Sequence, residues 1–356
     1  MKILIAGNMG YIGPTVVRRF RESHPDAVLV GFDMGYFANC LTASDIFPEC
    51  RLDFQYFGDV RKFAADVLTN VDAVVYLAAI SNDPMGATFE TVTLDVNYRA
   101  AVVLAQKAKE AGAKTFVFAS SCSIYGCAED GARTEESSLN PLTAYANSKV
   151  FAERDLALLA DRTFTVTSLR FATACGMSER LRLDLVLNDF VASALARGQI
   201  TILSDGTPWR PLIHIKDMAR AIDWGVQRRS CDGDEFLAVN VGSDKWNNQV
   251  KDLAEAVTKV IPKVEVVINK NAQPDKRSYR VSFEKFKRLA PDYQPEVDLI
   301  TAITDLKEGL QAMNFHDRDF RNSKLIRLNV LKNLKNDGYL TDGLQWTADS
   351  QRLVEA

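Results

Sequence analysis

Short apolar runs alternate with amphipathic stretches along the first half of the chain. Apolar runs rich in valine and isoleucine are typical of strands that are buried on both faces. The stretches between them carry apolar residues at helical spacing. We therefore expect strands over residues 2–6, 28–32, 53–57, 72–79, 114–119 and 163–169, and helices over 15–21, 61–69, 88–111 and 142–160. This alternation predicts an α/β fold with a doubly wound parallel sheet.

The alternation weakens after about residue 171. There we expect strands over 200–203, 211–215, 236–241 and 264–268, and helices over 181–196, 216–229, 246–260 and after 282. Residues 317–356 are polar and charged, and we expect them to wrap the surface. We therefore predict one domain over residues 1–170, to which parts of 205–245 return. Residues 171–356 would form mainly a smaller α/β C-terminal domain with its extension.

A glycine turn follows the first strand, and an acidic residue ends the second. The turn comprises Gly7, Asn8, Met9, Gly10, Tyr11, Ile12 and Gly13. Asp33 follows about twenty residues later, which is the spacing of a dinucleotide site in a Rossmann-type sheet. In such a site the glycines admit a diphosphate, and the carboxylate accepts from ribose hydroxyls. Asp33 would repel a 2′-phosphate and Met34-Gly35 supply no arginine, so we predict NAD rather than NADP.

Composition excludes several classes of protein. The 356 residues are 47% hydrophobic and 25% charged, with a net charge of -3, so we expect no nucleic-acid partner. No apolar run approaches the ~20 residues of a membrane span, and because residues 1–6 enter the first strand directly we expect no cleavable signal. The six cysteines show no Cys-x-x-Cys pairing and the three histidines are isolated. We therefore predict a cytoplasmic protein with reduced thiols and no metal.

A serine cluster and a Tyr-x-x-x-Lys pair carry the candidate chemistry. Tyr145 and Lys149 lie four residues apart on the helix expected over 142–160, so both side chains face the same way. A phenol titrates near pH 10 and is a poor base at pH 7, but a lysine ammonium and an oxidised nicotinamide would lower its pKa. The tyrosinate would take a proton from a sugar hydroxyl while hydride leaves the same carbon for NAD. A serine hydroxyl across the cleft would hold that oxygen.

These motifs together resemble one family over nearly the whole chain. The chain is similar to extended short-chain dehydrogenases/reductases, namely the NAD-dependent nucleotide-sugar epimerases and dehydratases. The resemblance is carried by Gly7-x-x-Gly10-x-x-Gly13, Asp33, Gly58-Asp59-Val60, Leu77-Ala78-Ala79, Asn97, Ser120-Ser121-Cys122-Ser123-Ile124-Tyr125-Gly126, Tyr145-x-x-x-Lys149, Arg170-Phe171 and Trp209-Arg210-Pro211-Leu212-Ile213-His214.

The resemblance implies roles for the cofactor and for assembly. It places the catalytic Ser/Thr of the family on Ser121 and gives Lys149 the nicotinamide ribose as a second partner. The remaining implied cofactor contacts are Asp59 and Val60 at the adenine, Leu77, Ala78 and Ala79 along the dinucleotide, and Asn97 and Phe171. Family members usually dimerise through two helices per subunit, here those near 90–110 and 142–160, so we expect a homodimer.

The substrate implied by the resemblance is a nucleotide-diphospho-sugar, whose two phosphates match arginines by charge and geometry. Arg210 occupies the position of a phosphate-binding arginine, and Asn188 that of an asparagine near the sugar or phosphates. Further candidates are Arg180, Arg182, Arg277 and Arg280, together with Ser81, Ser121, Cys122 and Ser123 near the sugar.

Two departures from the family bear on the reaction. Ala172 replaces the asparagine that usually follows Arg170-Phe171, so a common polar substrate contact is missing. Cys122-Ser123 replaces the Asp-Glu pair of the 4,6-dehydratases, and serine supplies no acid near pH 7. Cys122 is either a catalytic thiol that moves a proton at C5 or a small buried packing residue.

We predict a 4-epimerase that acts through a transient 4-keto sugar. The alternatives are a dehydratase, C5-epimerase or reductase of the same family, or a cofactor sensor without catalysis.

Overall fold

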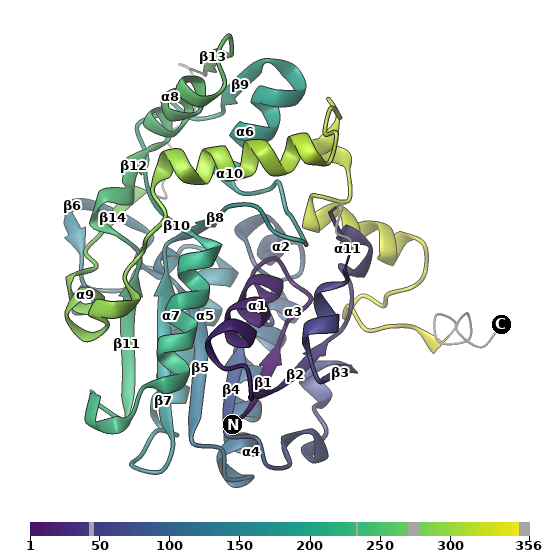
Figure 1. Cartoon of the computed structure of the whole chain (residues 1–356), viewed down its shortest axis with the longest axis vertical. Helices are drawn as coiled ribbons and strands as arrows, with labels where there is room; N and C mark the ends of the chain where they lie inside the picture. The colour runs from purple at the N-terminus through teal and green to yellow at the C-terminus, as the bar shows by residue number, and fades with distance from the viewer. Residues whose placement is uncertain (43–45, 233, 270–277, 349–356) are drawn as a thin grey trace.

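The structure is a computed structural model that describes residues 1–42, 46–232, 234–269 and 278–348 (Figure 1). Its strands are β1 (Lys2–Ala6), β2 (Val28–Asp33), β3 (Phe54–Phe57), β4 (Ala73–Tyr76), β5 (Thr115–Ser121), β6 (Cys127–Arg133), β7 (Thr165–Phe171), β8 (Thr173–Cys175), β9 (Gln199–Ile202), β10 (Trp209–His214), β11 (Phe236–Val241), β12 (Asn247–Gln249), β13 (Glu265–Ile268) and β14 (Ser278–Val281). Its α-helices are α1 (Gly13–Ser23), α2 (Asp83–Thr88), α3 (Glu90–Leu94), α4 (Ala100–Glu110), α5 (Ala144–Ala157), α6 (Val186–Arg197), α7 (Ile215–Gln227), α8 (Val250–Val260), α9 (Glu284–Leu289), α10 (Leu299–Ala312) and α11 (Arg327–Asn336).

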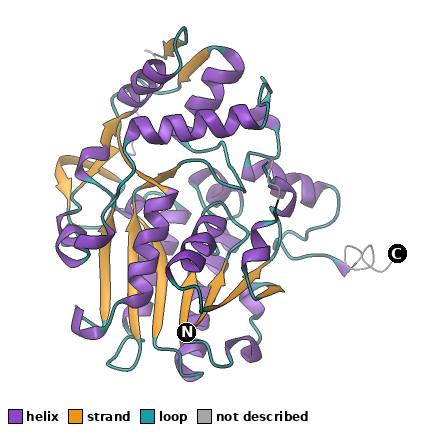
Figure 2. Cartoon of the chain, viewed as in Figure 1, coloured by secondary structure: helices purple, strands orange, loops and turns teal. Residues whose placement is uncertain are grey.

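Seven parallel strands form the main sheet in the order β11-β7-β5-β4-β1-β2-β3. Successive side chains of a strand point to opposite faces, so a sheet covered on both sides needs continuous apolar runs. In β1, Ile3 and Ile5 pack with α1 and α7, whereas Leu4 packs on the other face with α4 and α5. The expected doubly wound α/β fold is confirmed, and Figure 2 shows the strand layer between its helices.

The second half of the chain builds a smaller region beyond the carboxyl ends of these strands. It contains the short sheets β13-β9 and β12-β10-β8 and the helices α6, α8 and α10 (Figure 1). β11 (Phe236–Val241) leaves this region and pairs with β7 in the main sheet. The chain therefore crosses between the two regions several times, and a ligand lying between them touches both.

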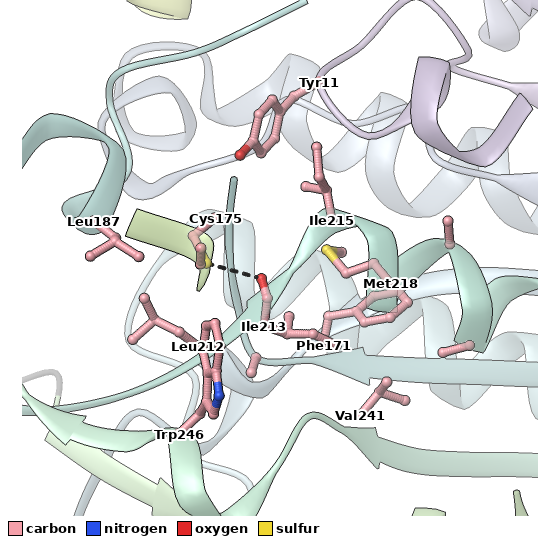
Figure 3. Close-up of a cluster of buried hydrophobic side chains, with 14 of the residues drawn as sticks. Tyr11, Phe171, Cys175, Leu187, Leu212, Ile213, Ile215, Met218, Val241 and Trp246 are labelled. Carbon is pink, nitrogen blue, oxygen red and sulfur yellow. Dashed lines mark hydrogen bonds between the residues drawn. The ribbon is translucent and has the colours of Figure 1, made fainter. Parts of the chain in front are cut away.

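A shared apolar cluster joins the two regions. Phe171 of β7 and Val241 of β11 meet Leu212, Ile213 and other side chains of the smaller region (Figure 3). Each of these side chains is at most 4% exposed. The cluster is continuous with the side chains that pack under α1, so the hydrophobic effect holds both regions together as one core.

Tyr11 of the glycine turn adds a polar connection to the smaller region. Its hydroxyl donates to the carbonyl of Gly176 (2.6 Å) and accepts from Asn188 Nδ2 (3.0 Å). The Ser178 hydroxyl donates to the Tyr11 carbonyl (2.6 Å). Both ends of this residue are thus anchored on the loop that follows β8, which fixes the turn relative to α6.

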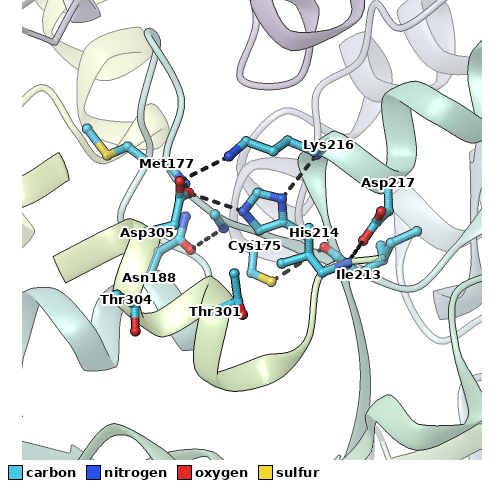
Figure 4. A network of polar contacts seen from close by, with 12 residues as sticks. Cys175, Met177, Asn188, Ile213, His214, Lys216, Asp217, Thr301, Thr304 and Asp305 are labelled. Carbon is cyan, nitrogen blue, oxygen red and sulfur yellow. Dashed lines mark hydrogen bonds and ion pairs between the residues drawn. The ribbon is translucent and has the colours of Figure 1, made fainter. Parts of the chain in front are cut away.

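A second polar network holds α10 against β10 (Figure 4). The backbone N–H of Lys216 donates to His214 Nδ1 (3.2 Å), so Nε2 carries the proton that Asp305 accepts (3.2 Å). Burial raises the pKa of Asp305, but its hydrogen bonds from His214 and the Met177 N–H outweigh this and lower the pKa to about 2. A Cβ at Gly176, where φ is +114°, would lie 2.2 Å from His214 Nε2, so this loop requires glycine.

Three expected helices differ from the structure. Residues 61–69 form two short 3-10 turns rather than one helix. The expected helix over 88–111 is divided into α3, a π-helical turn over 95–99 and α4, and it begins only after Phe89, whose φ of -126° ends α2. The helix expected from 181 begins at Val186, and the preceding residues 182–185 line the cavity without regular secondary structure. Helical spacing in a sequence does not reveal such breaks, since packing decides them.

The C-terminal segment returns to the main sheet after α10. Its apolar residues Leu331 and Leu344 pack against Ile80 and Tyr36 at the ends of β4 and β2. The Trp346 indole N–H donates to the carbonyl of Met34 (2.8 Å), and the Tyr36 hydroxyl donates to the carbonyl of Leu344. None of the helices in the described ranges has the length and apolar character needed to cross a bilayer.

Candidate active site

One cavity of about 910 Å³ lies at the carboxyl ends of the main-sheet strands, below the smaller region. Ligands of open parallel sheets bind at this edge. Its wall contains most of the residues expected from the sequence, namely Gly7, Gly10, Tyr11, Ile12, Gly13, Asp33, Asp59, Val60, Leu77, Ala78, Ala79, Ser81, Ser121, Ser123, Tyr145, Lys149, Phe171, Arg182 and Arg210.

The glycine turn offers backbone rather than side chains to the cavity. Gly7 has φ of +91°, and a Cβ there would lie 2.4 Å from the backbone nitrogen of Ala78. Its N–H donates to the carbonyl of Phe32 (2.8 Å), which places the turn between β2 and β4. The first turn of α1 follows immediately without a side-chain cap, and Gly13 at its start lines the cavity. This close, side-chain-free cradle fits the diphosphate of a dinucleotide.

The Asp33 carboxylate is held by backbone donors beside this turn. Oδ2 accepts from the Met9 N–H (3.0 Å) and Oδ1 from the Gly35 N–H (2.8 Å). Burial raises the pKa of Asp33, and these two hydrogen bonds counteract that effect. The remaining acceptor capacity of both oxygens fits a ribose diol. Asn8 and Met9 do not line the cavity, and Asn8 instead donates to Gln55 (2.7 Å).

Tyr145, Lys149 and Ser121 lie together on the cavity wall that the main-sheet region forms. Lys149 Nζ lies 5.6 Å from the Tyr145 ring centroid and donates to the carbonyl of Ala119 (2.7 Å). Burial raises the pKa of Tyr145 to about 12, although a hydrogen bond with Ser121 lowers it. Burial also lowers the pKa of Lys149 to about 7. The protein groups alone therefore keep the phenol protonated, and a further positive charge in the cavity is needed to ionise it.

Asn97 supports α5 rather than the ligand. Its amide exchanges hydrogen bonds with the backbone of Ile80 (2.8 and 3.1 Å) and donates to the Ser148 hydroxyl (3.1 Å). Ser148 in turn donates to the carbonyl of Tyr145 (2.7 Å). Asn97 does not line the cavity, and it positions α5 against the loop after β4.

The expectation that Cys122 acts as a catalytic thiol or substrate contact needs correction. The side chain is fully buried, does not line the cavity and donates to the carbonyl of Arg170 (3.0 Å). Burial raises the pKa of this thiol, which opposes proton transfer at neutral pH. Cys122 therefore corresponds to the alternative of a packing residue.

Arg170, which follows the strand expected over residues 163–169, points into the protein. It forms an ion pair with Glu153 (2.7 Å), which also accepts from the hydroxyl of Ser120 (2.6 Å). Arg170 Nη1 donates to the Tyr125 hydroxyl (3.1 Å), which donates to Asn240 (2.7 Å). This buried network fixes the loop that carries Ser121, because each polar group in it has a partner.

The expected substrate residues divide into two groups. Arg182 lines the cavity, pairs with Asp184 (2.6 Å) and donates to the Ser81 hydroxyl (2.8 Å), and Arg210 lines it from β10. Three others do not line it: Asn188 holds the backbone of Gly176 and Arg182, Arg180 pairs with Glu49, and Arg280 lies over the Trp209 ring. Arg277 lies outside the described residues.

Several wall residues were missed by sequence reasoning. Tyr36 and Phe37 come from the stretch after Asp33, Tyr279 from β14, and Arg321 and Arg327 from the C-terminal segment. Arg321 pairs with Asp189 of α6 (2.8 Å). No local spacing marks these residues, although the aromatic pair that begins three residues after Asp33 was a usable signal. Among the described residues, no three His, Cys, Asp or Glu side chains gather as metal ligands.

Comparisons with known proteins agree with this geometry. The model of the NAD dependent epimerase/dehydratase family matches residues 3–242. The chain is 29% identical over 231 residues to an uncharacterized UDP-glucose epimerase of Bacillus subtilis, covering 62% of this chain and 71% of the relative. It is 26% identical over 345 residues to UDP-glucuronic acid decarboxylase 5 of Arabidopsis thaliana, covering 94% and 92%. The structure of MoeE5 in complex with UDP-glucuronic acid and NAD has a TM-score of 0.74 at 24% identity, over 88% of this chain and 99% of that chain.

Proposed function

Because the chain belongs to the NAD-dependent epimerase/dehydratase family, we propose that it is a nucleotide-diphospho-sugar epimerase of the 4-epimerase type. Its cofactor is NAD. The observation that carries the proposal is the grouping of Ser121, Tyr145 and Lys149 on one cavity wall that also presents Arg182 and Arg210. Relatives named as a UDP-glucose epimerase and a UDP-glucuronic acid decarboxylase support a nucleotide sugar as the substrate.

In this proposal Tyr145 exchanges the proton of the sugar hydroxyl at C4. When bound, NAD supplies a reversible hydride acceptor and a positive charge beside the phenol. The Ser121 hydroxyl holds the same sugar oxygen, and Lys149 keeps the phenol in place from the neighbouring helical turn. Arg210 binds the sugar diphosphate by charge, which leaves the sugar ring free to turn before Tyr145 returns the proton.

The residues after Ser121 favour epimerisation over dehydration. An elimination needs a general acid and a general base at the sugar, and here Cys122 faces the core while Ser123 carries a hydroxyl. Of the five aspartates on the wall, Asp184 and Asp189 are engaged by arginines. A redox-neutral reaction at one carbon needs only the groups that Ser121 and Tyr145 supply.

The test is product mass after incubation with a panel of UDP-, dTDP-, GDP- and CDP-sugars. Epimerisation leaves the mass unchanged, with inversion at C4 seen by NMR and without added cofactor. A product lighter by water or carbon dioxide, or heavier by two hydrogens, would refute the proposal. Tyr145→Phe should lower kcat by about 10²- to 10⁴-fold while the protein retains NAD. Unchanged turnover in this variant would equally overturn it.

We also propose that the chain forms a homodimer through α4 and α5 and works in the cytoplasm. Support for the dimer comes from exposed apolar side chains on these helices, namely Val103 on α4 (47% exposed) and Leu158 at the end of α5 (82% exposed). Support for the cytoplasm comes from Cys40, Cys50, Cys122, Cys127 and Cys175, which form no disulfide.

A further inference from the structure

Arg327 brings a buried cation from the C-terminal segment into the cofactor cavity. It is the first residue of α11, it is 2% exposed, and it lines the cavity wall. Its guanidinium lies 4.4 Å from the Phe37 ring centroid, and Nη2 donates to the carbonyl of Arg180 (2.6 Å). Nη1 is buried and has no hydrogen-bond acceptor among the residues that the structure describes.

Among the described residues, the carboxylates near Arg327 form ion pairs with other arginines, so Arg327 has no counterion. Arg180 is paired with Glu49 (2.8 Å) and Arg182 with Asp184 (2.6 Å). The Cys40 thiol lies beside Arg327, but burial raises its pKa, so it stays neutral at pH 7. Burial lowers the pKa of Arg327 to about 10, which still leaves the guanidinium charged. A buried charge with an unused donor is costly, and an anion in the cavity would offset that cost.

The order of strands in the main sheet indicates which part of a bound dinucleotide lies nearest to Arg327. Strand β1 lies between β4 and β2, so the glycine turn after β1 lies between the ends of these neighbours. The segment that carries Arg327 packs on Ile80 after β4 through Leu331, and Arg327 itself lies over the Phe37 ring after β2. Arg327 therefore lies, like the glycine turn, between the carboxyl ends of β4 and β2. The diphosphate of a dinucleotide binds at this position.

We propose that Arg327 binds the diphosphate of NAD and thereby completes the cofactor site from the C-terminal segment. The glycine turn supplies backbone donors to the diphosphate, and Arg327 supplies its counter-charge. The fork of the guanidinium suits two phosphate oxygens. Nη2 is fixed by the Arg180 carbonyl, and Nη1, which is buried and has no acceptor among the described residues, reaches the diphosphate when the side chain turns toward the cavity that it lines. The proposal rests on the cofactor and not on the sugar chemistry proposed above, so either can fail alone.

The experiment measures ligand affinities of the full-length chain after its NAD has been removed with charcoal. Isothermal titration compares NAD, ADP-ribose, adenosine and UDP in the wild type, Arg327→Gln, Arg327→Lys and the control Lys335→Gln. Lys335 is on the same helix but exposed and paired with Asp342 (2.8 Å). Arg327→Gln should weaken NAD and ADP-ribose by about 10- to 100-fold and leave adenosine unchanged. Arg327→Lys should recover part of the loss, and Lys335→Gln should match the wild type.

Three results would overturn the assignment: no change for ADP-ribose, an equal loss for adenosine, or a loss confined to UDP, which would assign Arg327 to the diphosphate of the substrate instead. Should Arg327→Gln not fold, hydrogen exchange of the wild type decides the question. Saturating ADP-ribose should slow exchange in the first turn of α11, whereas saturating adenosine should not. Equal protection by both ligands, or none by ADP-ribose, contradicts the proposal.

Discussion

Replacing Lys149 by methionine should stabilise the NAD-free chain and remove much of the pH dependence of its stability. Lys149 is 2% exposed, and burial lowers its pKa from 10.5 to about 7, with a small opposing effect from Glu153. The unfolded chain therefore binds a proton that the folded chain releases between about pH 7 and about pH 10.5. Stability must rise with pH across this window, because the unfolded state binds more protons there.

The size of the effect follows from the two pKa values. At about 1.4 kcal/mol per pKa unit, keeping Lys149 charged in the folded protein costs roughly 5 kcal/mol below pH 7. Between about pH 6 and about pH 9 the wild type recovers roughly 3 kcal/mol of this cost. Methionine leaves the Ala119 carbonyl without its donor, which costs roughly 1–3 kcal/mol. The variant should therefore be more stable by roughly 2–4 kcal/mol near pH 6 and about equal near pH 9.

Urea unfolding of wild type, Lys149→Met and the exposed control Lys335→Met at these pH values measures the difference directly. Burial also raises the pKa of the Cys40, Cys122 and Cys175 thiols, so their contribution falls as pH rises above the usual thiol range. That contribution is common to all three proteins and cancels in the difference. If the gap between Lys149→Met and the wild type is the same at both pH values, Lys149 does not carry a depressed pKa and the reasoning is wrong.

Three further predictions concern the site and the assembly. Cys122→Ala should keep kcat within about 3-fold of the wild type, because the thiol faces the Arg170 carbonyl and not the cavity. A loss of about 100-fold in kcat would show that the thiol takes part in catalysis. Arg210→Gln should raise KM for the nucleotide sugar by about 10- to 100-fold with little change in kcat, and an unchanged KM would remove it from the diphosphate site. Val103→Glu should convert a dimer to a monomer in light scattering, and an unchanged mass would exclude α4 from the interface.

The sequence was most informative where local spacing determines structure. Buried strands such as β1 give continuous apolar runs, and the positions of Gly7 and Asp33 follow from one strand-turn-helix-strand unit. Tyr145 and Lys149 share a helix, so their proximity was predictable. Arg327 was not, because it reaches the cavity only through the path of the chain after α10. The direction of Cys122 was equally hidden, since the local motif does not say which side of the loop faces the core.

Tyr11 ties the turn that receives the dinucleotide to the loop after β8 and to α6, which contributes to another part of the cavity wall. Neither the glycine turn nor the loop after β8 can move independently without breaking the hydrogen bonds that join them. Ligand binding at one end therefore pre-organises the other, and we expect positive heterotropic cooperativity, with each ligand raising the affinity for the second by the same factor.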